Sequence, residues 1–505
     1  MSMKEADINS AVKPWLPPKW DAEADVVVCG YGGAGAVAAI SAYDAGAEVI
    51  LIERKLVPGG NTVMSEGGMY ACNTEQQKAL GIKDSPEWMY KYLQAANKNR
   101  LDEEACRIFC EQSASAVKWV SDLGVNMPAK EGGWIVPGQV LEGNELAYTD
   151  IAPAVPRLNW CEGGGPAWWA AIKKAVESRA IKVMLKTTLK ELVTGPQKEV
   201  LGIRAEDRSG GSIYIKARRG VILTTFGNFE KCPELIDVFA PTATGKQFVS
   251  MLATGATTGE DILAAMAIGA AINRINSDPF VGEDCVPVAV VSKGRGISAG
   301  ANLQASHFLA VNKEGKRFAN ENSDDPRALG LTIVKQTDHT SYAIFGDDLV
   351  AKGPRFIALG FSEGLVKEME AGVVKKSGTL AGLAEQLGID PKALQTTVDN
   401  FNSNAARGVD PDFGRTINLT PFTTSNWYAF ELTTNCQFRA GLRNNAKAQV
   451  LDVCGRVIPR LYVAGALDGA SSHGMFKYTC GCHLTSLVIF GRIAGASAAA
   501  LPAWS

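Results

Sequence analysis

The sequence predicts an α/β protein that begins with a Rossmann-like, doubly wound domain, and three consecutive patterns support this fold class. Residues 26–29 are an apolar run that ends in glycines, residues 36–44 have the small-residue pattern of a helix, and residues 49–52 are a second apolar run. Strand, glycine turn, helix and strand make one βαβ unit, whose two strands pair in parallel. We expect this unit to begin the first domain.

The turn after the first strand has the spacing of a dinucleotide-binding motif. Gly30, Gly32 and Gly35 read G-x-G-x-x-G. The first glycine permits the tight turn, the second lets the backbone approach a pyrophosphate, and the third lets the helix pack against the strand. The phosphates would lie on free N–H groups at the positive end of the helix, beside Gly33 and Ala34. The alternative is a glycine-rich turn in an ordinary α/β protein, but the flanking elements in register favour dinucleotide binding.

An acid and a glycine-rich loop follow the βαβ unit. Glu53 lies close to the spacing of roughly 20 residues at which an acid accepts hydrogen bonds from an adenosine ribose. Two glycine pairs, Gly59-Gly60 and Gly67-Gly68, then prevent long regular structure and expose backbone amides. Such a loop can wrap a flat polar ring and donate N–H groups to its carbonyls. The alternative is a flexible surface loop, and the place directly after the βαβ unit favours the cofactor role.

Length and charge limit the class of protein. With 505 residues, the chain is expected to form two or three domains. The net charge is −2 and there is no long basic run, so nothing indicates nucleic acid or an anionic membrane as a partner. The apolar content of 46% describes a soluble globular protein without a membrane-spanning run. Residues 1–20 lack the apolar core of a secretory signal and are expected to form an arm.

The cysteines indicate a reducing compartment. There are 11 of them, scattered and odd in number, which suits the cytoplasm better than a disulfide framework. Cys480, Cys482 and His483 suggest a metal site, but the spacing is C-x-C and a second ligand pair is missing. We therefore expect a crowded backbone position and no metal. A C-x-x-C-H haem attachment site is also missing, so electrons must come from another molecule.

The remaining patterns divide the chain into an outer and an inserted domain. The outer domain continues with expected helices at 85–123, 167–179, 259–272 and 484–499 and expected strands at 182–185, 201–204, 212–217, 220–226, 448–452 and 460–465. Gly227 ends one of these strands, and Leu484 begins the last helix, whose free N–H groups would face an anionic ring. Beyond residue 276, short strands alternate with turns and are followed by helices. We expect an arm at 1–20, a first domain at 21–276 and 438–505, and an inserted α+β domain at 277–437.

Motifs along nearly the whole chain resemble those of the FAD-dependent fumarate reductase and 3-ketosteroid dehydrogenase superfamily, in the form of a flavocytochrome c-type flavoprotein without a haem domain. The motifs lie at residues 26–35, 53–55, 59–61, 65–69, 73–78, 315–321, 461–465 and 490–495. The resemblance implies FAD held by the doubly wound domain, with the inserted domain capping the flavin. It also implies hydride exchange between flavin N5 and a carbon of a C=C bond conjugated to a carbonyl or carboxylate.

The resemblance and the glycine patterns together give a set of expected FAD contacts. They are Gly30, Gly32, Gly33, Ala34, Gly35, Glu53, Arg54, Lys55, Gly59, Gly60, Asn61, Thr62, Ser65, Gly67, Gly68, Gly227, Gly465, Asp468, His473 and Leu484. His473 is included because it matches a family His-Gly pair near the flavin. Relatives carry an acid after Gly465, where this chain has Ala466, so either Asp468 makes that contact instead or the contact is absent.

The expected substrate site departs from the fumarate reductase pattern. Cys436 and Asp278 stand where the family carries its substrate histidines, and Lys477 stands near the place of the final substrate arginine. Arg327 is the candidate for the arginine that donates the proton, in a segment with an extra residue or two. Because charge-assisted pairs are the strong ones, the loss of these contacts argues against fumarate as the substrate.

Tyr478 and Gly481 instead resemble the ketosteroid dehydrogenase pattern, in which a tyrosine hydroxyl and a glycine N–H polarise the keto oxygen of the substrate. Two donors at an oxygen that gains negative charge stabilise an enolate-like transition state. The alternative for Tyr478 is a packed aromatic with a satisfied hydroxyl. Arg439 and Lys477 are further candidates for substrate binding, and the alternative for both is a surface charge.

These features lead to three hypotheses. The first is a cytoplasmic FAD oxidoreductase that exchanges hydride with the C=C or C–C bond α,β to a ketone in a cyclic, largely apolar substrate, like a 3-ketosteroid dehydrogenase or an ene-reductase. The second is a fumarate reductase-like enzyme of anaerobic respiration that reduces an unsaturated carboxylate held by Arg327, Arg439 and Lys477. The third is a non-catalytic flavoprotein that carries electrons. Both enzyme hypotheses require an external electron donor or acceptor, and both leave the direction open.

Overall fold

The computed structural model describes residues 16–129, 148–225, 232, 235, 258–273, 285–292, 295–299, 303, 306–323, 326–333, 335–358, 361–436, 441–469, 471–473, 479 and 481–504. The chain forms two compact units, which are described one at a time. The first is Met1–Leu235, Thr254–Ser277 and Arg439–Ser505, and the second is Ile236–Ala253 and Asp278–Phe438. The domain limits expected after residues 276 and 437 differ by one residue from two of these boundaries, whereas Ile236–Ala253, expected in the first domain, belongs to the second unit.

The first unit is built on an eight-stranded sheet. Its order is β17 (Gln449–Leu451), β18 (Val457–Val463), β8 (Ser212–Leu223), β1 (Ala22–Cys29), β2 (Val49–Glu53) and β5 (Lys182–Leu185), with β6 (Thr188–Thr194) and β7 (Val200–Glu206) attached through β8. β1 is parallel to β2 and to β8, and β8 is parallel to β18. The carboxyl ends of these four strands therefore lie along one edge, which is where open α/β sheets bind their ligands.

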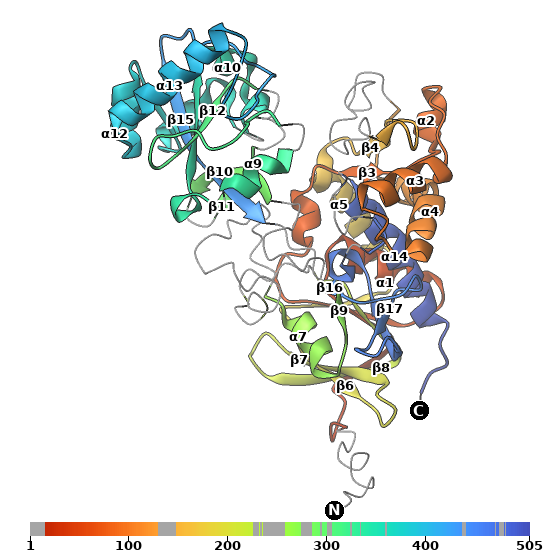
Figure 1. Ribbon diagram of the computed structural model, residues 1–505. Coiled ribbons are helices and arrows are strands. Elements are labelled where there is room, and N and C mark those ends of the chain that lie inside the picture. Colours follow the sequence, from red (N-terminus) through yellow and green to blue (C-terminus); the bar gives the residue numbers. More distant parts are fainter. Residues whose placement is uncertain are drawn as a thin grey trace, which may run out of the picture. The chain divides into compact units, whose positions relative to one another are not determined.

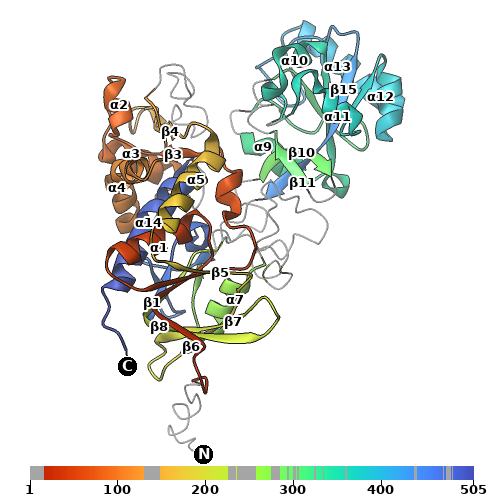
Figure 2. The ribbon, with the colours of Figure 1, turned by 180° about the vertical axis from the view of Figure 1, so that it is seen from behind.

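Two helices pack closely on this sheet and on each other. α1 (Gly33–Asp44) and α14 (Cys482–Ala499) lie side by side in both ribbon views (Figures 1 and 2). A Cβ at Gly495 of α14 would lie 2.4 Å from the Ala38 carbonyl oxygen in α1, so glycine lets the two backbones touch. Within the described ranges, α14 is the one helix long and apolar enough to cross a membrane, and 72% of it is buried inside the protein, as in a core helix.

The helical region expected at 85–123 is interrupted. It consists of α3 (Pro86–Ala96) and α4 (Glu103–Asp122). The expected start is confirmed, because the Ser85 side chain caps α3 and a proline follows as its first residue. The prediction of one continuous helical region is wrong. Lys98 and Asn99 have φ values of 57° and 54°, a left-handed conformation that a right-handed helix cannot contain.

The first unit also contains shorter elements. They are η1 (Gly60–Met64), β3 (Gly68–Tyr70), α2 (Glu75–Ala79), β4 (Leu158–Trp160), α5 (Gly164–Glu177), α7 (Glu260–Ala267), β9 (Ile272–Asn273), β16 (Gly441–Leu442) and η6 (Gly465–Asp468). α5 begins three residues before the expected helix, and α7 ends five residues before it. The two strands expected at 212–217 and 220–226 are one strand, because Gly220 stays paired with Val26 of β1. β6 was not expected.

The second unit is a six-stranded sheet whose strand pairs are antiparallel. Its order is β11 (Arg295–Ser298), β10 (Cys285–Ser292), β15 (Trp427–Cys436), β13 (Ser341–Gly346) and β12 (Leu309–Asn312), with β14 (Val374–Ser377) also on β15. The described residues of this unit include two hydrophobic cores. One contains residues of α9 (Pro326–Ile333), α10 (Asp347–Lys352), η4 (Pro354–Phe356), η5 (Glu363–Leu365) and α11 (Val366–Glu370), and the other contains residues of α12 (Leu380–Leu387) and α13 (Pro391–Ala406). The short helix η3 (Thr337–His339) lies between α9 and β13 in the chain.

Candidate cofactor-binding and active site

The glycine turn between β1 and α1 has one crowded and one open position. Gly30 has a φ of 103°, and a Cβ at Gly35 would lie 1.8 Å from the Gly30 carbonyl oxygen, so a larger residue cannot occupy position 35. At Gly32 the nearest atom to a Cβ would be the Gly59 oxygen at 3.8 Å, which leaves this backbone open to a bound group. The Gly33 N–H, expected to be free for a phosphate, is instead donated to Thr62 Oγ1 at 3.1 Å. The turn therefore fits the close approach of a pyrophosphate.

Glu53 ends β2 beside this turn. Its Oε2 accepts the Tyr31 N–H at 2.9 Å, and its Oε1 accepts the Lys55 N–H at 2.7 Å. The carboxylate is therefore held in one position, and its remaining lone pairs can accept hydrogen bonds from a ribose. Arg54 makes a separate contact, because its Nη1 donates to the Thr258 hydroxyl at 2.5 Å.

The loop with the two glycine pairs is packed between the glycine turn and α5. Gly59 donates its N–H to the Tyr31 carbonyl at 2.8 Å, and Asn61 and Thr62 follow within η1. Gly165 donates its N–H to the Ser65 carbonyl at 2.9 Å, and a Cβ at Gly165 would lie 2.3 Å from that oxygen. A Cβ at Gly67 would lie 2.7 Å from the Gly164 carbonyl carbon, and one at Gly68 would lie 3.1 Å from the Trp160 ring. Gly165 was missed as a site residue because the sequence marks it only as the start of a helix.

Gly465 and the start of α14 also reach the glycine turn. A Cβ at Gly465, whose φ is 77°, would lie 2.7 Å from the Ala34 Cβ, so glycine lets η6 meet α1. Asp468 is buried, with 2% of its surface exposed, and accepts the Ser486 hydroxyl at 3.4 Å. Leu484 lies in the first turn of α14 and is buried. The three predicted FAD contacts Gly465, Asp468 and Leu484 therefore belong to η6 and the first turn of α14.

His473 is a buried ring with fixed neighbours. Its Nδ1 lies 2.9 Å from the Ser472 hydroxyl. The ring stacks on Phe109 with centroids 5.3 Å apart and meets the edge of His483 at 5.1 Å. These contacts determine the plane of the ring, which suits a residue that positions a neighbouring group.

Gly481 is held by β3. Its φ is 80°, and its carbonyl oxygen accepts the N–H groups of Tyr70 and Thr485, each at 3.2 Å. A Cβ would lie 2.6 Å from Leu158 Cδ2 and 2.8 Å from the Tyr70 nitrogen. The paired strands β3 and β4 therefore determine where this predicted catalytic residue lies.

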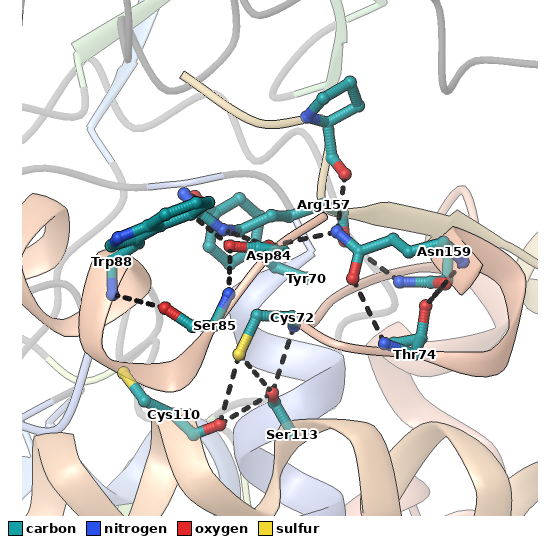
Figure 3. A network of polar contacts seen from close by, with 12 residues as sticks. Tyr70, Cys72, Thr74, Asp84, Ser85, Trp88, Cys110, Ser113, Arg157 and Asn159 are labelled. Atoms are coloured by element: carbon teal, nitrogen blue, oxygen red, sulfur yellow. Dashed lines mark hydrogen bonds and ion pairs between the residues drawn. The ribbon is translucent and has the colours of Figure 1, made fainter. Parts of the chain in front are cut away.

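A buried ion pair holds β3 and β4 to the segment before α3 (Figure 3). Arg157 directs Nε and Nη2 to the two Asp84 oxygens, each at 2.8 Å, and donates from Nη1 to the Tyr70 hydroxyl at 3.2 Å. Both charged side chains are 0% exposed. Gln77 Nε2 donates to Asp84 Oδ2 at 3.0 Å and to the Pro156 carbonyl at 2.8 Å. The sequence indicated Asp84 only as part of a helix start, so this pair was missed.

Cys72 lies in the same network (Figure 3). Its Sγ is 3.5 Å from the Cys110 carbonyl oxygen and from the Ser113 hydroxyl. Burial raises the pKa of the Cys72 thiol to about 11, so the thiol is neutral near pH 7 and is a poor nucleophile.

Several predicted site residues lie outside the described part of the chain. They are Gly227, Arg439, Lys477 and Tyr478, together with Asp278. Arg327 lies in α9 and Cys436 ends β15, both in the second unit, and their side chains are also outside the described part. The roles of these residues stay predictions. Gly481, in the first unit, is the member of the predicted catalytic set that the structure describes fully.

The family is decided by a match over most of the chain. The family model described as FAD binding domain matches residues 25–484. The chain belongs to this family. FAD is therefore its cofactor, and the resemblance inferred from the motifs is confirmed.

Relatives of this family member are reductases and dehydrogenases. The chain is 31% identical to a fumarate reductase (cytochrome) of Shewanella frigidimarina over 489 residues, covering 94% of this chain and 77% of the relative. It is also 31% identical to a urocanate reductase of Eggerthella lenta, covering 97% and 76%. A solved 3-ketosteroid-Δ4-(5α)-dehydrogenase of Rhodococcus jostii, in complex with 4-androstene-3,17-dione, aligns with a TM-score of 0.68 and 28% identity over 95% of this chain and 98% of that chain.

These similarities confirm the predicted fold class and show that the protein is an FAD-dependent oxidoreductase acting on C=C or C–C bonds. The hypothesis of a non-catalytic electron carrier is therefore set aside. The residues fit FAD, because the open backbone at Gly32 and the held carboxylate of Glu53 match the pyrophosphate and ribose of a dinucleotide. When bound, FAD supplies hydride exchange at flavin N5, and the protein supplies binding and orientation.

Glu53→Ala should weaken FAD binding by about 10- to 100-fold, as expected for the loss of one hydrogen bond to a charged group. The measurement is the FAD dissociation constant, from flavin fluorescence after dilution of the holoenzyme. Glu104→Ala, at an exposed acid on α4, is the control and should leave the constant unchanged. Full FAD retention in Glu53→Ala would contradict the ribose role.

Arg157→Met should destabilise the protein by about 3–5 kcal/mol, because it leaves the Asp84 carboxylate buried without its partner. The measurement is urea unfolding of the holoenzyme, followed by tryptophan fluorescence. Combining Arg157→Met with Asp84→Leu should recover much of the loss, since the double variant removes both charges. If the free energy of unfolding of Arg157→Met lies within about 1 kcal/mol of the wild-type value, the ion pair does not hold the structure together.

Proposed function

We propose that the enzyme exchanges hydride with a C=C or C–C bond α,β to a ketone in a cyclic, largely apolar substrate. The supporting observation is Gly481, a glycine with a φ of 80° whose carbonyl is anchored by Tyr70 and Thr485. An anchored carbonyl fixes this part of the backbone, and catalysis at a developing oxyanion needs donors that do not have to reorganise. The solved ketosteroid dehydrogenase, whose complex holds a steroid enone, supports the substrate class.

In this proposal, Tyr478 and Gly481 bind the ketone oxygen. The Tyr478 hydroxyl and the Gly481 N–H donate two hydrogen bonds to an oxygen that gains negative charge as the adjacent C=C bond is reduced. Arg327 or a tyrosine moves the proton at the α-carbon. Arg439, Lys477 and Cys436 contact the rest of the substrate. The same arrangement serves either direction of the reaction, with an external electron donor or acceptor, and we propose a cytoplasmic location.

A second candidate is the reduction of an unsaturated carboxylate, as in anaerobic respiration. It is favoured by the names of two relatives with 31% identity, a fumarate reductase and a urocanate reductase. Arg327, Arg439 and Lys477 would then bind the substrate carboxylate, because charge-assisted hydrogen bonds are the strong ones. The residues Asp278 and Cys436, in place of the family's histidines, favour the ketone.

Steady-state assays separate the two candidates. With reduced viologen as the electron donor, cyclic enones should be turned over with a kcat/KM at least about 10-fold above that for fumarate and urocanate, a difference of about 1.4 kcal/mol in transition-state binding. The assay records viologen oxidation for matched concentrations of each substrate. Turnover confined to unsaturated carboxylates would contradict the ketone proposal.

Tyr478→Phe should lower turnover of the best enone by a factor of about 10²–10³, as the loss of one oxyanion donor does. FAD content should stay unchanged, because the hydroxyl is proposed to contact the substrate and not the cofactor. The measurement is kcat together with the ratio of bound flavin to protein. Activity near that of the wild type would remove Tyr478 from the mechanism.

A further inference from the structure

Asp261 is a buried acid that the expected set of cofactor contacts does not include. It lies in the first turn of α7, with 6% of its surface exposed. Its neighbour Glu260 is partly exposed and pairs with Arg54 at 3.5 Å. Burial of a carboxyl group without a cationic partner is costly, so the position of Asp261 calls for an explanation.

Threonines connect Asp261 to the glycine turn. The Thr225 hydroxyl forms a hydrogen bond with the Asp261 carboxyl. Thr225 Cγ2 lies 3.1 Å from where a Cβ at Gly30 would be. The preceding residue, Thr224, donates its hydroxyl to the carbonyl oxygens of Cys29 at 2.8 Å and Gly30 at 3.0 Å. Asp261 is therefore attached to the carboxyl edge of β1 and β8, where the dinucleotide binds.

One oxygen of the Asp261 carboxyl group has no hydrogen-bond partner among the described residues. This oxygen, Oδ2, is buried. Buried polar atoms are nearly always hydrogen-bonded, and each exception needs a reason. At the edge of a dinucleotide site, the reason that fits is a polar group of the ligand. The charge of Glu53, whose predicted partner is the ribose, also acts on Asp261.

We propose that Asp261 binds the adenosine half of FAD as a neutral carboxylic acid, so that FAD binding favours the protonated form of the protein. A neutral carboxyl group has one O–H donor and one acceptor oxygen. The edge of an adenine ring has the complementary pair, a ring-nitrogen acceptor and an amino donor. The inference rests on FAD binding alone and is independent of which substrate is used.

The charges around Asp261 favour its neutral form. Burial, and then the carboxylates of Glu260 and Glu53, raise the pKa of Asp261 to about 7. The third titratable group that interacts with it is the buried thiol of Cys29. The phosphates of FAD add negative charge at the neighbouring turn and should raise the pKa further. Ionisation of Asp261 therefore opposes FAD binding.

The stability of the folded protein and its affinity for FAD are both expected to fall as the pH rises. Because the pKa is raised in the folded protein, Asp261 ionises in the unfolded chain from about pH 4 upwards but stays neutral in the folded protein until about pH 7. The folded state therefore loses stability relative to the unfolded chain as pH rises through this window. Above pH 7 the folded protein without FAD ionises first, and FAD affinity falls. Asp261→Asn keeps the shape of the side chain and removes both effects.

The test is the FAD dissociation constant of the holoenzyme between about pH 6 and pH 8.5, measured by flavin fluorescence after dilution. For the wild type, the constant should rise by about 10-fold over this range, because each tenfold change in affinity corresponds to one unit of pKa shift. For Asp261→Asn, it should change by less than about 2-fold, since the titrating group is gone. Comparing the two proteins separates the effect of Asp261 from that of any other group that titrates in this range.

A pH-independent constant in the wild type overturns the proposal without any variant. An unchanged pH dependence in Asp261→Asn also overturns it. ADP, added as a competitor of FAD, should show the same loss of affinity with rising pH, and competition independent of pH would overturn the assignment to the adenosine half. Glu104→Gln, at an exposed acid, is the matched control and should behave like the wild type.

Discussion

The first unit depends on a single backbone contact, that between the third glycine of the turn and the carbonyl of the first. A Cβ at Gly35 would lie 1.8 Å from that oxygen. Because glycine has no Cβ, α1 can lie directly on the end of β1. The same closeness continues around α1, where Gly465 meets Ala34 and Gly495 of α14 meets Ala38. The contacts at Gly35 and Gly495 bring backbone against backbone, and the contact at Gly465 brings backbone against the Ala34 side chain. This gives dense packing that leaves no room for adjustment and holds the cofactor edge in place.

The loops at this edge are held by residues far away along the chain. Gly165 supports the carbonyl of Ser65, and Tyr70 anchors Gly481 through the paired strands β3 and β4. The Arg157–Asp84 pair fastens those strands to the start of α3. A buried ion pair of this kind contributes less to net stability than to selecting one arrangement, because desolvation offsets much of the attraction. The position of the predicted oxyanion donor at Gly481 therefore depends on a buried ion pair that acts through β3 and β4.

The sequence predicts features that depend on neighbouring residues, but it does not predict contacts between segments far apart in the chain. The βαβ unit, the cap at Ser85 and the family itself were predicted, because each depends on the spacing of neighbouring residues. The break at Lys98 and Asn99 was missed, since two left-handed residues leave no mark on hydrophobic periodicity. The continuity of β8 was missed because the strand has a register shift at Arg218 and Arg219, and only the pairing of Gly220 with Val26 of β1 shows that it continues. Gly165, Arg157 and Asp261 gain their roles only from partners that the fold brings near.

The first unit is assembled from early and late segments of the chain, with the second unit inserted between them. During synthesis on the ribosome, β1 and α1 emerge long before α14, against which α1 must pack. Until then, the alanine-rich face of α1 has no partner, while the intervening unit can already complete its own sheet. Loading with flavin is consequently a late event in biogenesis, and the nascent chain passes through a stage in which a chaperone has an apolar surface to protect.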